Sequence, residues 1–256
     1  MHHWQIVPEI AGCSAGLRIA STQAMDAVDQ GRHFVVEGES GSGRRLLARS
    51  AWLRRVPDVR SLFTLDCRIL GDNADDVLFG RRDGSEFRCG RLNFAQGVLL
   101  LHAETLPRAT QQRLAQLLER YCCRPPGEGL QVVLTSAPAA LDEELTAVLL
   151  RVHLPPLRER MEDLRTIANS FLRAASPYEA VRCSQALLDR FRHYEWPGNI
   201  AELRAVLRRM LLLSHNGLLD VGHLDELTMR DGSGLDWMLP VYATIDVHTA
   251  ANRSLL

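Results

Sequence analysis

The most unusual absence in this sequence is lysine, because all 30 basic residues of the 256-residue chain are arginine. Chemistry that requires a lysine amine, such as Schiff-base formation, is therefore excluded. The 31 acidic residues bring the formal net charge to −1. A charge this close to zero implies no bulk attraction to nucleic acid or to an anionic membrane surface.

Metal-binding patterns and long apolar runs are also absent. The six cysteines include no C-x-x-C pair, and the nine histidines show no consistent ligand spacing, so we predict reduced thiols and no metal site. The longest apolar run, near residues 98–101, is far too short to span a bilayer. The first ten residues lack the basic and apolar regions of a signal peptide. We therefore expect a cytoplasmic protein with no membrane partner.

Short apolar segments alternate with amphipathic ones as far as Pro155. This alternation predicts a parallel α/β sheet that is covered by helices on both faces. The predicted strands are residues 33–36, 62–65, 98–101, 131–135 and 152–154, and the predicted helices are residues 44–55 and 109–121.

The pattern after Pro156 is purely helical. The predicted helices are residues 161–174, residues 184–193 with Ser184 as N-cap, and a long helix that follows the turn at 196–199 and ends near residue 215. We therefore predict an α/β domain over residues 10–155, a helical lid over 156–220 and a weakly patterned tail over 221–256.

A glycine-rich loop lies between the first predicted strand and the first predicted helix. Its residues are Gly38, Glu39, Ser40, Gly41, Ser42 and Gly43. In that position glycines let backbone N–H groups turn inward, and the helix N-terminus adds partial positive charge for a phosphate. A complete phosphate loop continues with Lys and then Ser or Thr, whereas this chain has Arg44 and Arg45. The loop alone leaves open a nucleotide-binding site and a glycine-rich turn without a ligand.

Further motifs follow this loop in a fixed order. They are a G-x-S at 12–14 upstream of the loop, Cys67, LFG at 78–80, GVLLL at 97–101, LPPLRER at 154–160 and WPGNIAEL at 196–203. Together with GESGSGRR at 38–45, these segments resemble the AAA+ domain of sigma-54-dependent transcription activators over about residues 10–215. The resemblance implies a P-loop AAA+ fold, with a three-layer αβα parallel sheet followed by a small all-helical lid. It also implies a ring-forming ATPase that binds ATP or ADP at 38–45 and remodels sigma-54 RNA polymerase.

The positions that carry the family's chemistry are replaced in this chain. Arg44 stands for the phosphate-binding lysine, His102 and Ala103 stand for the two acids after the third strand, Ala137 stands for the sensor amide, Asp142 and Val148 stand for the arginine fingers, and Ala201 stands for the lid arginine. These losses predict weak magnesium binding and no catalytic residue.

Two residues could compensate for these losses. Glu104 follows one position after the family's acids, so on a continuing strand it would face the opposite side of the sheet. It could serve the site only if the strand end is bulged. Arg151 could replace an arginine finger across a subunit boundary.

The family's contacts with polymerase and DNA are also altered. Residues 81–90 lack the GAFTGA motif that contacts sigma-54, and we predict a solvent-exposed turn there. Residues 245–256 resemble only the opening helix of a helix-turn-helix. Two arginine groups, at 44–60 and 204–209, are predicted as solvated helix faces, the alternative being a subunit, phosphate or DNA contact.

Three hypotheses follow from these observations. In the first, the chain is a regulatory pseudo-ATPase with weakened nucleotide binding and no hydrolysis, which associates with itself or with a homologous AAA+ activator. In the second, it is an atypical but active ATP-dependent activator that uses Arg44 and Glu104. In the third, it is a nucleic-acid or protein binding module that only inherits the fold.

Overall fold

The computed structural model describes residues 10–83, 86–93, 95–121, 129–178, 180–214 and 217–230. The fold divides into two compact units. Unit 1 contains Ile10, Ala15–Glu39 and Gly43–Pro155, and unit 2 contains Ala11–Ser14, Ser40–Ser42 and the residues from Pro156 onward. Two short N-terminal segments therefore fold with the C-terminal unit.

Unit 1 is built around a five-stranded parallel sheet with the order β2-β5-β6-β1-β7. The strands are β1 (Phe34–Glu37), β2 (Leu62–Asp66), β5 (Gly97–Leu101), β6 (Gln131–Ser136) and β7 (Leu150–His153). Each coincides with a predicted strand to within two residues at either end. Since the strands are parallel, their carboxyl ends lie along one edge, where the loops after β1, β2, β5 and β6 emerge.

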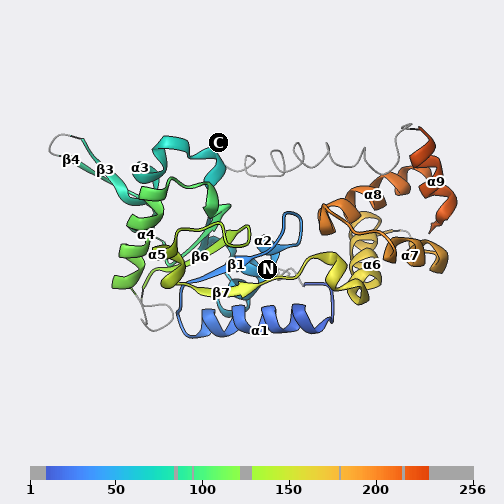
Figure 1. Cartoon of the computed structure of the whole chain (residues 1–256), viewed down its shortest axis with the longest axis horizontal. Helices are drawn as coiled ribbons and strands as arrows, with labels where there is room; N and C mark the ends of the chain where they lie inside the picture. Colours follow the sequence, from blue (N-terminus) through green and yellow to red (C-terminus); the bar gives the residue numbers. More distant parts are fainter. Residues whose placement is uncertain are drawn as a thin grey trace. The chain divides into compact units, whose positions relative to one another are not determined.

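Helices cover both faces of this sheet (Figure 1). Successive residues of each central strand belong to different cores: Phe34 and Val36 pack on one face, whereas Val35 packs on the other. The first face carries α1 (Ala15–Asp29) and α2 (Arg44–Arg55), and the second carries α3 (Ala74–Phe79), α4 (Arg108–Arg120) and α5 (Glu143–Ala147). The predicted three-layer αβα architecture is therefore confirmed.

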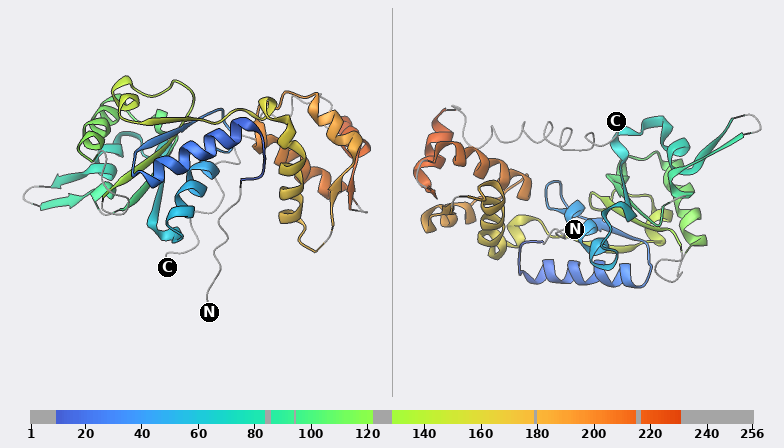
Figure 2. Two further views of the ribbon diagram at one scale, coloured as in Figure 1. Left: turned by 90° about the horizontal axis from the view of Figure 1, so that it is seen from below. Right: turned by 180° about the vertical axis from the view of Figure 1, so that it is seen from behind.

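The segment that was predicted as an exposed turn at 81–90 is instead an antiparallel hairpin. Its strands are β3 (Gly80–Asp83) and β4 (Glu86–Cys89), which pair with each other and not with the main sheet. The hairpin projects from unit 1 beside α3 (Figures 1 and 2). The turn prediction is wrong because the two strands satisfy each other's backbone hydrogen-bonding groups. Such pairing needs no alternating hydrophobic pattern, so the sequence shows no sign of it.

Unit 2 consists mainly of helices around its own core. These are α6 (Leu164–Ala175), α7 (Gln185–Arg192), α8 (Asn199–Leu213) and α9 (Val221–Arg230), accompanied by the short parallel strands β8 (Arg182–Cys183) and β9 (Leu218–Leu219). Ser184 caps α7 as predicted, since its Oγ accepts a hydrogen bond from the Leu187 N–H at 3.2 Å. Helix α9 lies where the sequence predicted a weakly patterned tail, and the predicted opening helix at 245–256 lies outside the described residues.

Short 3₁₀ helices connect these elements where the structure describes the chain: Val59–Ser61, Cys67–Ile69, Gly71–Asn73, Arg91–Asn93, Ala103–Thr105, Leu157–Glu159 and Met161–Asp163. Within the ranges that the structure describes, no helix combines the length and apolar character needed to cross a membrane.

Candidate functional site

The glycine-rich loop leaves β1 and runs directly into α2. Gly41 and Gly43 have positive φ angles of 74° and 104°, which glycine adopts without strain. Gly43 also occupies the N-cap position of α2, where no side chain caps the helix. The N–H groups of the first turn of α2 are therefore available to an anion, as a phosphate loop requires.

The three central loop residues are held through their carbonyl oxygens by other residues of unit 2. Asn199 Nδ2 donates to the Ser40 carbonyl at 3.0 Å, the Ala201 N–H donates to the Gly41 carbonyl at 3.3 Å, and an Arg160 guanidinium nitrogen donates to the Ser42 carbonyl at 2.5 Å. In a trans peptide the C=O and the following N–H point in opposite directions. The N–H groups of Gly41, Ser42 and Gly43 therefore face away from these contacts.

This packing leaves no room for a side chain at the middle of the loop. An ideal Cβ on Gly41 would lie 2.3 Å from the Gly198 carbonyl oxygen and 3.0 Å from Ala201 Cβ. Ala201, which stands where the family has its lid arginine, thus contacts the loop directly. A glycine is required at position 41 by packing as well as by its φ angle.

Arg44, the first residue of α2, is buried with only 7% of its surface exposed. The prediction of a solvated face is therefore wrong at this residue, although Arg45 is exposed as expected. The side chain of Arg44 lies close enough to Glu104 for its charge to lower the pKa of that carboxyl. An arginine thus brings positive charge to the start of the helix, where the family has lysine.

The strand β5 ends at Leu101, and the chain turns sharply at His102. His102 adopts the left-handed conformation with φ 55° and ψ 47°, and its N–H donates to Thr135 Oγ1 at 3.1 Å. Ala103 is fully buried at the start of the following 3₁₀ turn. Because the strand does not continue, the argument that Glu104 faces the opposite side of the sheet no longer applies.

Glu104 joins a cluster of ionisable groups at the carboxyl edge of the sheet. Its Oε1 lies 3.6 Å from His102 Nδ1, and its side chain is 18% exposed. Burial raises the pKa of Glu104, but the hydrogen bond from His102 and the positive charges of Arg44 and His102 outweigh burial and leave this pKa below its usual value. Glu104 is therefore ionised at neutral pH, and its Oε2 is buried without a hydrogen-bond partner in the described part of the chain.

Asp66 and Cys67 complete this cluster from the end of β2. Asp66 forms an ion pair with Arg68 at 2.7 Å. Burial, with the neighbouring charges of Asp66 and Glu104, raises the pKa of the Cys67 thiol to about 12, so this thiol stays protonated. Among the described residues no group of three or more His, Cys, Asp or Glu side chains is arranged to hold a metal ion.

The residues at the predicted arginine-finger positions have local structural roles. Asp142 caps α5 by accepting the Glu144 N–H at 3.1 Å and also pairs with Arg108 at 2.7 Å. Val148 ends α5. Arg151 pairs within the chain, its guanidinium lying 2.8 Å from Glu37 at the end of β1.

The sensor position offers no side-chain amide. Ser136 is fully buried, and its hydroxyl donates to the Ala137 carbonyl at 2.9 Å. In the second arginine group, Arg204 and Arg208 are exposed, as predicted, and their guanidinium carbons lie 5.3 and 5.9 Å from the centroid of the Phe171 ring.

Two functional residues that sequence reasoning missed are Arg160 and Asp163. Arg160 is 2% exposed and Asp163 is fully buried. Asp163 accepts hydrogen bonds from the Cys13 N–H at 2.5 Å, the Ser14 N–H at 2.8 Å and Ser14 Oγ at 2.6 Å. Arg160 and Asp163 thus connect residues 40–42 and residues 11–14 to the rest of unit 2. Arg160 ends the LPPLRER motif and Asp163 follows it three residues later. Because charged residues usually lie at the surface, the sequence gives no sign that these two are buried.

This arrangement, a glycine loop between strand and helix on a parallel sheet followed by a helical unit, defines a P-loop protein of the AAA+ class. Two family models match the chain: the sigma-54 interaction domain over residues 10–147 and the AAA+ ATPase lid domain over residues 158–234. The chain therefore belongs to the sigma-54-dependent transcription regulators, as the resemblance predicted.

Curated relatives and solved structures agree with this assignment. The chain is 29% identical over 233 residues to the anaerobic nitric oxide reductase transcription regulator NorR of Vibrio vulnificus, covering 80% of this chain and 46% of that protein. It is 30% identical over 221 residues to the alginate biosynthesis regulator AlgB of Pseudomonas aeruginosa, covering 75% of this chain and 49% of that protein. The chain thus spans less than half the length of these relatives.

The fold is also that of NtrX from Brucella abortus, solved in complex with ADP. The two share a TM-score of 0.68 at 19% identity, and the match covers 84% of this chain and 55% of NtrX.

Proposed function

We propose that this chain is a regulatory AAA+ domain that binds ATP or ADP at residues 38–45 without efficient hydrolysis. It acts in the cytoplasm by associating with itself or with a homologous AAA+ activator, and so modulates transcription. Its α/β domain ends at Pro155 and its lid begins at Pro156. The proposal rests on the cluster of Arg44, His102 and Glu104, in which His102 stands where the family has its first acid and Arg44 lies near the one remaining carboxylate.

The loop and Arg44 fit a nucleotide. The N–H groups of Gly41, Ser42 and Gly43 are turned away from the carbonyl contacts, and Arg44 adds a buried positive charge beside them. Such a loop binds phosphate through backbone amides and the helix N-terminus. The complexes of NtrX with ADP and ATP support this part of the proposal.

Magnesium fits these residues poorly. Mg²⁺ prefers carboxylate oxygens and water, but the first acid position is His102, whose backbone turns away from the strand. The remaining carboxylate, Glu104, is held beside His102 and near the charge of Arg44. The positive charge of Arg44 already offsets that of this carboxylate, so a bound nucleotide would depend on arginine and backbone amides to balance its own charge.

An active ATPase is a second candidate, and one observation favours it. Glu104 is ionised, and its Oε2 is buried without a partner in the described ranges. A carboxylate with a free oxygen beside a phosphate site could orient a water molecule. The active ATPase requires the Glu104 carboxylate for ATP turnover, whereas the regulatory domain does not.

The variant Glu104→Gln separates these candidates. Removing a negative charge near the phosphates should tighten nucleotide binding by about 1 kcal/mol, or about fivefold. ATP turnover should equal the protein-free background in both forms. Isothermal titration calorimetry and a phosphate-release assay measure the two quantities, with the exposed Glu162→Gln as control. Turnover that is above background and is abolished by Glu104→Gln would establish the active ATPase instead.

The partner is tested by mixing this chain with a purified sigma-54 activator that carries the intact catalytic residues. Co-elution and a changed ATPase rate of that activator are expected. Absence of any association at micromolar concentrations of both proteins would contradict this part of the proposal. The hairpin β3–β4 lacks the GAFTGA motif, so the proposal includes no contact with sigma-54 through it.

A further inference from the structure

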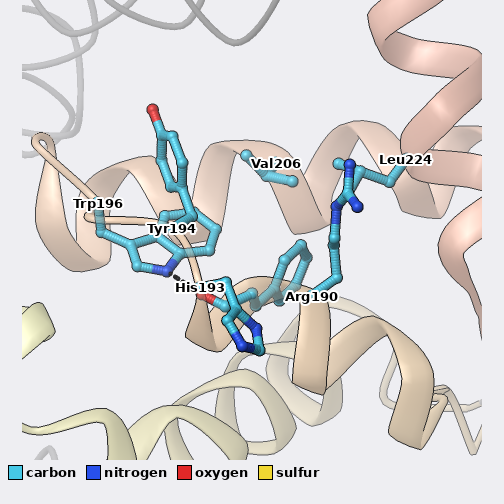
Figure 3. A pocket seen from close by; sticks show the side chains of 7 residues that line it. Arg190, His193, Tyr194, Trp196, Val206 and Leu224 are labelled. Carbon is cyan, nitrogen blue, oxygen red and sulfur yellow. Dashed lines mark hydrogen bonds between the residues drawn. The ribbon is translucent and has the colours of Figure 1, made fainter.

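A cavity of about 420 Å³ lies within unit 2, and none of its lining residues belongs to the cluster of Arg44, His102 and Glu104 (Figure 3). It is lined by Arg190, Phe191, His193, Tyr194, Trp196, Val206 and Leu224. In Figure 3, Arg190 and Leu224 lie on one side of it, and Tyr194 and Trp196 lie on the other. Its volume is within the range of small-molecule sites, which are mostly apolar with a few polar groups.

The aromatic side chains that line this cavity pack against one another. The ring of Trp196 meets Phe191 and Tyr194 edge to face, with centroids 5.1 Å apart in both pairs. Trp196 Nε1 donates to the Phe191 carbonyl at 2.8 Å, and the Tyr194 hydroxyl donates to Glu202 at 2.9 Å. Since the protein itself satisfies these polar ends, the half-buried Tyr194 presents ring surface to a ligand, whereas Trp196 and Phe191 are almost fully buried behind it.

Among the described residues that line the cavity, Arg190 brings positive charge and none is a carboxylate. In the described part of the chain no acidic side chain pairs with Arg190, whereas its neighbour Arg192 pairs with Asp189 at 2.7 Å. His193 uses Nδ1 with the Asp189 carbonyl at 2.7 Å, which leaves Nε2 for another group. A cation beside aromatic walls favours a ligand that has an aromatic ring and an anionic group.

The cavity wall is continuous with the turn that holds the phosphate loop. Trp196 and Asn199 both have positive φ, at 52° and 54°, which is strained for residues other than glycine. The buried Glu202 accepts the Tyr194 hydroxyl with one oxygen and the Gly198 N–H, at 2.7 Å, with the other. Gly198 and Asn199 in turn contact Gly41 and Ser40.

We propose that this cavity binds a small aromatic carboxylate, and that the bound ligand changes the conformational freedom of the loop at 40–42. The carboxylate pairs with the exposed Arg190, and the ring packs against the half-buried Tyr194. A shift of Tyr194 is transmitted through its hydrogen bond to Glu202 and on to the turn at 196–199. A resulting change in nucleotide affinity rests on the function proposed above, whereas binding in the cavity and the response of the loop do not.

Binding is tested by calorimetry with phenylacetate, with neutral phenylacetamide as the matched probe. Phenylacetate should bind at least about tenfold more tightly than phenylacetamide, and Arg190→Gln should remove most of this difference. Arg192→Gln, on the same helix but outside the cavity, should have no effect. The proposal is overturned if phenylacetate does not bind, if both probes bind equally, or if the two variants behave alike.

Coupling to the loop is tested without nucleotide, by hydrogen–deuterium exchange of the peptide that contains residues 38–44. Saturating phenylacetate should change its exchange rate at least about threefold in the wild type and not in Arg190→Gln. An unchanged rate despite binding would overturn the coupling. Failure of nucleotide to bind would contradict the proposed function, and it would leave both of these results interpretable.

Discussion

Asp163→Ala is expected to lower the free energy of unfolding by about 3–5 kcal/mol, because it breaks a buried charged network. Asp163 is fully buried, and it accepts three hydrogen bonds from Cys13 and Ser14. Its charge also stabilises the guanidinium of Arg160, whose pKa is lowered by burial and partly restored by Asp163. Alanine would leave the buried N–H and hydroxyl of Ser14 without this acceptor and the buried Arg160 without this opposite charge.

Urea unfolding followed by circular dichroism measures this loss. The control is Glu162→Ala, the exposed neighbouring acid, which should change stability by less than about 0.5 kcal/mol. Asp163→Asn should fall between the two, because the amide oxygen keeps one acceptor but removes the charge. A loss below about 1 kcal/mol for Asp163→Ala would show that this network contributes little net stability.

Arg44→Met is expected to weaken ATP and ADP binding by about 10–100-fold, which corresponds to the about 1.5–3 kcal/mol of a hydrogen bond to a charged group. Arg44 is the buried cation at the start of α2, and Glu104 is the ionised carboxylate whose pKa it lowers. Without Arg44, that carboxylate would repel the phosphates. Arg45→Met is the control, since Arg45 is the exposed neighbouring arginine.

A double variant tests whether Arg44 and Glu104 act together. Arg44→Met/Glu104→Gln should bind nucleotide more tightly than Arg44→Met, because it also removes the unbalanced negative charge. Calorimetry on the two single variants and the double variant gives the coupling energy. Equal weakening by Arg44→Met and Arg45→Met would contradict the special position of Arg44.

The sheet could be predicted from the sequence because its strands are buried on both faces and therefore appear as short continuous apolar runs. The segment that became β5 contains no polar side chain, the segment that became β6 has the apolar run 132–134 at its centre, and glycine or proline separates many elements. The motifs then gave the family, since their order along the chain reflects the order of the elements. The loop at 38–45 was identified for the same reason.

The remaining features depend on contacts between residues far apart in the sequence. The left-handed turn at His102 brings Glu104 into the cluster, and histidine has no strong local preference that predicts such a turn. Arg160 and Asp163 are charged residues that sequence patterns assign to the surface, yet each is buried because the other and the distant Ser14 and Ser42 satisfy it. The hairpin at 80–89 has no alternating apolar pattern.

The most direct test of the central claim is equilibrium binding of a fluorescent ATP analogue to the purified chain, once with magnesium and once with EDTA. The account predicts dissociation constants that agree within about threefold, because Arg44 and the backbone amides would hold the phosphates without a metal. Binding that weakens by about tenfold or more in EDTA would contradict the account, as would the absence of binding under both conditions.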